Sequence, residues 1–325
     1  MAGPKDEFPF SFAELNTFLA TCDEGSMSAA ARRLGVSQPA VSIALNELEG
    51  RLGTKLVDRS VRPLALTPAG SLLRQRASAL LSEARLIAPE MREVDRGRLP
   101  LLRIGVIDSL ARSLSGALAR VASEMADEVA VQAGLTAGHA SNLLTRKLDV
   151  MIGLDDLADV ADLERWPILS EPYVLALSPG LDAPETLDDL RALAESAVFV
   201  RYSARSSTGV DIDRHLRRLG LNFVRKLEFD TPYGVLTPLS ERPSFAITTP
   251  ICLIESGAKA EDIVAAPLPG PKFSRSVTLV AHPDRRRRAP KLLADAARAA
   301  LRETVPGRLE KIAPGLKDAV AIAGE

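Results

Sequence analysis

Apolar positions near the start of the chain recur at helical spacing. They lie three or four residues apart, with one adjacent pair, at Phe12, Leu15, Phe18, Leu19 and Cys22. The pattern predicts a helix that begins just after Ser11 and buries Cys22 in the core. Ser11 and Glu14 have the spacing of a capping box, which supports the same start. A short second helix is predicted from about Ser28 to Leu34, and Gly35 can supply the left-handed residue that ends it.

A third helix with two different faces is predicted next. Ser37 is placed to cap it, and Pro39 lies in its first turn, where a missing N–H costs nothing. The apolar face carries Val41, Leu45, Leu48 and Leu52. The polar face carries Gln38, Ser42 and Asn46. Amide side chains pair with adenine edges and a proline ring can contact a thymine methyl, so this helix suits a DNA major groove. The arrangement indicates a helix-turn-helix, with an ordinary surface helix as the alternative.

The segment after the third helix adds positive charge. Residues 56–66 resemble two short strands joined by a turn that carries Arg59 and Arg62. Next to a helix-turn-helix, such a hairpin is a wing whose arginines meet phosphates or the minor groove. Residues 27–76 hold eight basic and three acidic side chains, in a chain with a net charge of −1. A solvated basic face would explain the charge alone, but the local structure favours a DNA-binding surface.

These features together resemble a known family. The segment from Phe12 to Gly70 is similar to the N-terminal winged helix of LysR-type transcriptional regulators. The match is ungapped and in order, through Ser28-Ala29-Ala30-Ala31-Arg32-Arg33-Leu34, Val36-Ser37-Gln38-Pro39-Ala40-Val41-Ser42, Leu48-Glu49, Leu52-Gly53, Leu56, Arg59 and Leu66-Thr67-Pro68-Ala69-Gly70. We expect the DNA contacts to come from Ser28, Arg32, Ser37, Gln38, Pro39, Ser42, Asn46, Arg59 and Arg62. The chain departs from the family at Ala44 and Asn46, where a basic residue or glutamine is common, so contacts there should be weaker or differently specific.

A long helix is predicted after the wing, because Thr67-Pro68 again has the pattern of a cap and first helical position. Its apolar residues follow a heptad seam at Leu73, Ala77, Leu80, Ala84, Ile87, Met91 and Val94. A heptad seam is typical of a coiled coil or helix pair, and the alternative is a helix packed on its own domain. Pro89 should kink or end the helix near Ala88. The resemblance implies that this helix pairs antiparallel between two subunits, through Leu73, Ala77, Leu80, Ala84 and Ile87, and that the chain forms dimers or tetramers.

Strands alternate with helices in the rest of the chain, which predicts an α/β fold with parallel sheets. Strands are expected at 101–107, 129–133, 149–153, 173–177, 198–200, 226–229, 245–248 and 277–280. About 220 residues exceed one small sheet, so two α/β subdomains with a cleft between them are expected. The resemblance implies an effector domain similar to a periplasmic solute-binding protein. We therefore expect three parts: a winged helix-turn-helix at 1–66, a linker helix at 67–96 and an effector domain at 97–325. Its lobes would comprise about 97–167 with 273–325, and about 168–272.

Small hydroxyls near the ends of the predicted strands are the candidates for binding an effector. Ligands of such sheets lie at the carboxyl ends of strands, and hydroxyls bind carboxylates or phosphates well. The candidates are Ser109, Thr136, Tyr202, Ser203, Thr231 and Thr249, each of which taken alone could also be structural. Tyr202 and Ser203 form the strongest pair. Arg201 and Arg205 flank them and would favour an anionic effector if either side chain turns inward.

Composition excludes several classes of site. Cys22 and Cys252 are the only cysteines, so neither a disulfide scaffold nor a cysteine-based zinc site is expected. The three histidines lack metal-ligand spacing, and no cofactor loop or catalytic arrangement stands out. No apolar run approaches the roughly 20 residues of a membrane helix, and the first residues lack a secretory pattern, so we expect a cytoplasmic protein without membrane contact. Residues 313–325 are expected to be mobile.

The sequence therefore favours a DNA-binding transcriptional regulator that responds to a small metabolite. Its partners would be double-stranded DNA, the effector and further copies of itself, and no cofactor is expected. Three alternatives stay open: a solute-binding protein, an enzyme built on the α/β region, and a regulator that has no effector or that senses oxidation through Cys252.

Overall fold

The computed structural model describes residues 8–61, 63–93, 98–154, 157–224, 227–283 and 289–324. The chain divides into two compact units. The first comprises residues 1–97 with 144–147, and the second comprises residues 98–143 with 148–325.

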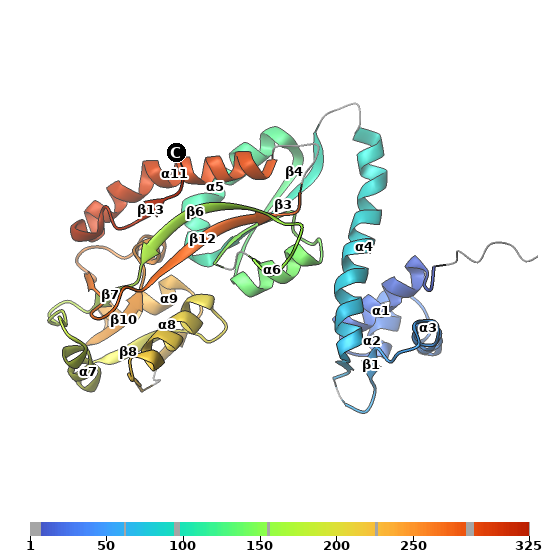
Figure 1. Ribbon diagram of the computed structural model, residues 1–325, viewed down its shortest axis with the longest axis horizontal. Helices are drawn as coiled ribbons and strands as arrows, with labels where there is room; N and C mark the ends of the chain where they lie inside the picture. Colours follow the sequence, from blue (N-terminus) through green and yellow to red (C-terminus); the bar gives the residue numbers. More distant parts are fainter. Residues whose placement is uncertain are drawn as a thin grey trace, which may run out of the picture. The chain divides into compact units, whose positions relative to one another are not determined.

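The N-terminal unit is a winged helix followed by one long helix (Figure 1). Its elements are α1 (Phe12–Glu24), α2 (Met27–Leu34), α3 (Gln38–Leu52), β1 (Val57–Asp58), β2 (Ala65–Leu66) and α4 (Pro68–Glu93). The predicted caps are confirmed: Ser11 and Glu14 form a capping box, and Gly35 adopts the left-handed conformation. The two wing strands pair antiparallel, as predicted.

Apolar side chains from α1, α2, α3 and the wing form one core. Its buried members include Phe18, Val41, Leu45 and Leu48, so the predicted apolar face of the third helix is confirmed. Cys22 is half-buried against this cluster, which is the packing role predicted for it. The start of α4 presses on the wing so closely that a side chain on Gly70 would collide with the backbone carbonyl of Leu56.

The apolar residues of α4 face two ways. Ala77 and Leu81 are buried against Leu15 of α1, and Leu73 packs beside them. The alternative interpretation, packing on the chain's own domain, therefore holds for this part of the predicted seam. Leu80 and Ile87 are 41% and 59% exposed. Val94 and the side chain of Met91 lie outside the described residues. The helix continues to Glu93, so it does not end at Ala88.

The second unit contains a six-stranded mixed sheet, which with its helices we call the first lobe. The strands are β3 (Leu99–Ile107), β4 (Ala126–Gly134), β5 (Val150–Gly153), β6 (Glu164–Pro172), β12 (Ser274–Ala281) and β13 (Ala321–Ile322), in the order β13-β6-β12-β5-β3-β4. The helical elements are η1 (Asp108–Leu110), α5 (Ala111–Met125), α6 (Thr136–Leu144), α11 (Ala289–Ile312) and η3 (Pro314–Leu316). Figure 1 shows α5 and α11 on one face of this sheet and α6 on the other.

A five-stranded sheet and its helices form the second lobe. The strands are β7 (Val174–Leu177), β8 (Val198–Tyr202), β9 (Leu227–Phe229), β10 (Ser244–Thr248) and β11 (Val264–Pro267), in the order β11-β7-β10-β8-β9. The helical elements are α7 (Leu187–Ser196), α8 (Ser207–Arg218), α9 (Pro232–Leu236), η2 (Thr237–Ser240) and α10 (Pro250–Ser256). Each lobe has its own apolar core.

Two segments connect the lobes. The chain passes from β6 into β7 and returns from β11 into β12, and β6 pairs with β12 along its whole length. The expected parallel pairing is found in part of each sheet. The strands β3, β4 and β5 are parallel to one another, as are β8, β9 and β10, but β12 and β7 run antiparallel to their neighbours because these segments cross between lobes.

Residues 321–323 of the C-terminal tail pair with the first lobe, contrary to the prediction that the tail is mobile. Strand β13 pairs antiparallel with β6, and the N–H of Ala323 donates to the carbonyl oxygen of Ile168 at 2.8 Å. Ile322 packs against the core of the first lobe. The tail thus completes the edge of a sheet, which its short sequence, rich in alanine, did not indicate.

Candidate DNA interface and effector cleft

The first turn of α3 presents polar side chains on the surface of the N-terminal unit. Gln38 and Pro39 are exposed, and Ser42 is half-buried one turn further on. The hydroxyl of Ser37 accepts the N–H of Ala40 at 3.3 Å, so Ser37 fixes the start of the helix. This geometry leaves Gln38 free to meet a base edge.

The wing is attached to the same helix. Nη2 of Arg59 donates to Oδ1 of Asn46 at 2.7 Å, which holds the wing arginine beside the polar face of α3. Ser28 and Arg32 are exposed on α2. Arg62 lies outside the described residues. A helix face and a wing arginine held together in this way can contact bases and phosphates at once.

Glu49 of α3 fixes the wing, and the sequence analysis assigned it no role. Its buried carboxylate accepts from Nζ of Lys55 at 2.8 Å and from the N–H of Leu56 at 2.9 Å. Burial acts to raise the pKa of this carboxyl, but the hydrogen bonds from Lys55 and from the backbone outweigh it and hold the pKa below its usual value. In the sequence, Glu49 could have been noticed as an acidic residue directly after Leu48, which belongs to the apolar face of the helix.

A small cavity lies where the two lobes of the second unit meet. The first lobe contributes residues at the ends of β3, β4 and β5, and the second contributes the start of α8. The lining residues are Ile107, Asp108, Ser109, Leu135, Thr136, Leu154, Ser206, Ser207 and Thr208. The space holds about one water molecule, so it is smaller than a metabolite.

The predicted effector residues fall into two groups. Ser109 and Thr136 line this cavity. The other four, Tyr202, Ser203, Thr231 and Thr249, are not among its lining residues. The phenol of Tyr202 is buried and bonds Oγ1 of Thr248 at 2.9 Å, and Oγ of Ser203 donates to Asp230. Thr231 and Thr249 accept backbone N–H groups at the starts of α9 and α10, so they act there as helix caps.

The two arginines beside Tyr202 do not line the cavity. Arg201 is buried and pairs with Asp213 and Glu228. Arg205 is exposed and pairs with Asp230. The side chains that the sequence analysis used to argue for an anionic effector are therefore engaged elsewhere.

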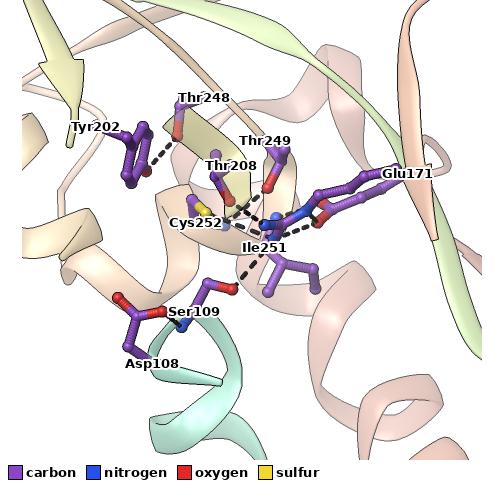
Figure 2. A network of polar contacts seen from close by, with 10 residues as sticks. Asp108, Ser109, Glu171, Tyr202, Thr208, Thr248, Thr249, Ile251 and Cys252 are labelled. Carbon is purple, nitrogen blue, oxygen red and sulfur yellow. Dashed lines mark hydrogen bonds and ion pairs between the residues drawn. The ribbon is translucent and has the colours of Figure 1, made fainter. Parts of the chain in front are cut away.

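A buried ion pair that the sequence did not reveal lies beside the cavity (Figure 2). Nε of Arg275 on β12 donates to Oε1 of Glu171 on β6 at 2.8 Å. Nη1 of Arg275 donates to Oγ1 of Thr208 at 2.9 Å, and Nη2 approaches Oγ of Ser109 at 3.3 Å. The cation is thus held by one carboxylate and by a hydroxyl from each lobe. An arginine on a strand gave no sequence signal, because its partners lie in distant segments.

Asp108 places a carboxyl in the wall of the same cavity. Burial raises its pKa to about 6, although the N–H of Ser109 and the charge of Arg275 act in the opposite direction.

Cys252 is fully buried at the start of α10, with its sulfur 3.5 Å from Nη2 of Arg275. Burial raises the pKa of the Cys252 thiol. A buried protonated thiol is a poor nucleophile, which weighs against the oxidation-sensing alternative.

Family models match both units of the chain. Residues 12–71 match the bacterial regulatory helix-turn-helix protein, lysR family, and residues 95–304 match the LysR substrate binding domain. Fold and matches together define a bacterial helix-turn-helix protein joined to a two-lobed substrate-binding region. The chain belongs to the LysR family, which confirms the resemblance found in its sequence.

Curated relatives align with different parts of the chain. The transcriptional regulator TfdS of Cupriavidus pinatubonensis is 40% identical over 30% of this chain and 32% of its own length. A probable hydrogen peroxide-inducible genes activator of Streptomyces viridosporus is 30% identical over 54% of this chain and 57% of its own. The activator AaeR of Escherichia coli is 25% identical over 78% of this chain and 76% of its own length. The alignments thus span about a third and just over half of the first two relatives. The relatives are transcriptional regulators.

Solved structures share the fold. A full-length OxyR of Pseudomonas aeruginosa is 21% identical with a TM-score of 0.62, covering 90% of this chain and 96% of that one. Full-length CbnR in complex with its target DNA is 21% identical with a TM-score of 0.57. The match covers 90% of this chain and 100% of CbnR.

No described helix is long and apolar enough to cross a membrane. The described residues also contain no group of three histidine, cysteine or acidic side chains placed to hold a metal ion.

Proposed function

We propose that this protein is a sequence-specific DNA-binding transcriptional regulator of the cytoplasm, without enzymatic activity. It reads an interrupted inverted repeat as a dimer or tetramer and responds to a small metabolite bound between the two lobes. We also propose the division into a DNA-binding domain at 1–66, a linker helix at 67–96 and an effector domain at 97–325. The observation that carries the proposal is the exposed polar face of α3 with the wing arginine fixed beside it.

The geometry of α3 supports separate roles for its side chains. Gln38 and Ser42 lie on the face that would enter a major groove, where each matched base contact contributes about 1–3 kcal/mol of discrimination. Arg59 offers a charge to the backbone of the DNA, and such a contact strengthens binding to all sequences alike. Dyad-symmetric DNA suits two copies of one recognition helix.

A footprint of the full-length protein on the DNA upstream of its own gene tests the proposal. We expect protection of an interrupted inverted repeat. Gln38→Ala and Ser42→Ala should lose discrimination between this site and a scrambled one. Arg59→Ala should weaken binding to both and reduce the salt slope by about 1. Gln75→Ala, an exposed amide change on α4, should bind like the wild type. Wild-type footprints from the Gln38, Ser42 and Arg59 variants would contradict the assignment.

The effector is proposed to bind at the cavity lined by Ser109, Thr136 and Thr208. An anionic effector stays a prediction, and the cation that bonds the hydroxyls of Ser109 and Thr208 is Arg275. A screen of small carboxylates and sugars by thermal unfolding of the full chain tests it. A ligand found this way should lose its effect in Thr136→Val, which keeps the shape and removes the hydroxyl. An unchanged effect in that variant would place the ligand elsewhere.

A further inference from the structure

We propose that Arg275 is a positioning residue that latches the two lobes together over the effector cleft. Its guanidinium bonds Ser109 of the first lobe and Thr208 of the second, and effector entry requires that at least one of these bonds breaks. The inference rests on the proposed function only in naming the cleft as the ligand site.

Arg275 lies where the lobes are joined. It is the second residue of β12, and its register partner on β6 is Glu171, the last residue but one of that strand. Both Nε and Nη2 of Arg275 lie 2.8 Å from Oε1 of Glu171. The other carboxylate oxygen, Oε2, accepts the N–H of Ile251 at 2.9 Å, which ties the pair to the start of α10. The cation is therefore fixed at the crossing strands.

The remaining edge of the guanidinium points to the cleft. Figure 2 shows Ser109 and Thr208 approaching this point from different segments, with Glu171 entering from its strand. Arg275 is only 4% exposed, so an N–H group that loses its acceptor is left unsatisfied away from solvent unless a water molecule replaces that acceptor. Ser109 and Thr208 thus accept hydrogen bonds from this buried cation only while the lobes stay close, and the sulfur of Cys252, 3.5 Å from Nη2, is a weaker further acceptor.

A second inter-lobe contact lies away from the cavity. The carboxylate of Glu255 on α10 accepts the N–H groups of Arg112 and Ser113 at 2.8 and 2.9 Å, at the start of α5. Arg112, Ser113 and Glu255 do not line the cavity, so the cavity walls themselves do not depend on this contact. When the cavity widens, Ser109 moves away from Thr208, and one guanidinium cannot keep its hydrogen bonds to both.

The test compares two double variants of the full-length chain by hydrogen exchange. Ser109→Ala with Thr208→Ala removes the two hydroxyl acceptors of Arg275, one from each lobe, and leaves the Arg275–Glu171 pair in place. The matched control, Ser123→Ala with Thr237→Ala, removes one hydroxyl in each lobe. The hydroxyl of Ser123 bonds the carbonyl oxygen of Ala119 in its own helix, and that of Thr237 bonds the carbonyl oxygen of Tyr233 in the preceding helix, both at 2.8 Å. We expect exchange in segments 107–110 and 206–209 to become about tenfold faster in the first double variant and to stay unchanged in the control.

Arg275→Lys gives a second measurement that keeps the charge beside Glu171. A single ammonium group replaces the planar fork, so it cannot reproduce bonds to Glu171, Ser109 and Thr208 together. We expect faster exchange at one or both segments and unchanged exchange in β10.

Wild-type exchange rates in the Ser109/Thr208 double variant would overturn the latch, and so would equal acceleration in its control. The measurement uses protein without DNA. A failed footprint with accelerated exchange would therefore reject the proposed function and keep the latch, and the reverse result would reject the latch alone.

Discussion

At the scale of single residues, the same chemistry serves different purposes according to position. The hydroxyl of Ser37 caps a helix, whereas the hydroxyl of Ser109 meets a buried cation at the cleft. Two carboxyls also differ in their surroundings: Asp108 has a raised pKa and Glu49 a lowered one. Burial dominates at Asp108, while hydrogen bonds dominate at Glu49, so their contributions to stability depend on pH in opposite directions.

Asp108→Asn should stabilise the protein at high pH. Because the folded-state pKa of Asp108, about 6, exceeds the usual 3.8, the stability contributed by its protonated form is lost as pH rises through 6. Asparagine stays neutral and keeps an acceptor for the N–H of Ser109. We expect the free energy of unfolding to rise by up to about 3 kcal/mol at pH 8 and to change little at pH 4. Denaturant unfolding at both pH values measures it, with the exposed Asp182→Asn as control. An equal effect at both pH values would contradict the prediction.

Glu49→Gln should destabilise the DNA-binding unit at neutral pH. The folded-state pKa of Glu49 lies below its usual value, so its contribution is complete above that value and is lost as pH falls through the folded-state pKa. Loss of the charged acceptor for Lys55 and Leu56 should cost about 1–3 kcal/mol at pH 7. Thermal unfolding between pH 3 and 7 measures it. If the variant and the wild type differ equally across this range, ionisation of Glu49 does not matter.

At the scale of elements, α3 and α4 each carry two faces with different partners. The apolar face of α3 is buried in its own unit and its polar face is open to solvent. The apolar surface of α4 is divided: Ala77 packs on α1, and Leu80 and Ile87 lie open. A second chain could therefore meet Leu80, Ile87 and the half-buried Ala84, whereas Ala77 is already covered by its own domain.

Leu80→Glu with Ile87→Glu should therefore shift the protein from dimer to monomer. Each glutamate places a charge where an apolar contact is proposed, and burying an unpaired charge is strongly unfavourable. Both positions are exposed in the single chain, so the fold should be retained. Sedimentation velocity measures the change, and circular dichroism checks the fold. Gln75→Glu, an exposed change outside the seam, is the control. A double variant that sediments like the wild type would place the subunit contact elsewhere.

At the scale of the whole molecule, distant parts of the chain complete each lobe. The first lobe is built from residues before and after the second, because β12, α11 and β13 return to the sheet that β3 begins. The two lobes are thus linked by two crossing segments, and a bond that spans them, such as that of Arg275, can report on their separation.

Removal of residues 320–325 should destabilise the first lobe. The truncation deletes β13 and the packing of Val320 and Ile322 against the lobe's core. Loss of this partly buried apolar surface should cost about 1–3 kcal/mol. Thermal unfolding of the truncated chain measures it, and Ile322→Ser in the full chain should show a smaller loss. An unchanged melting temperature after truncation would mean that the paired tail adds no stability.

The sequence by itself determined the N-terminal helices, the wing and the alternation of strands and helices. These features depend on neighbours in the chain: Ser11 caps through Glu14, and Val41, Leu45 and Leu48 share a face because of helical periodicity. Only the tertiary structure decided which side chains reach the cleft. Arg275 and Glu171 are 104 positions apart and meet because strand register places them opposite each other. Tyr202 and Ser109 both follow from the same sequence argument, as hydroxyls near strand ends. Only packing decided that Tyr202 is bonded inside a lobe and that Ser109 lines the cavity.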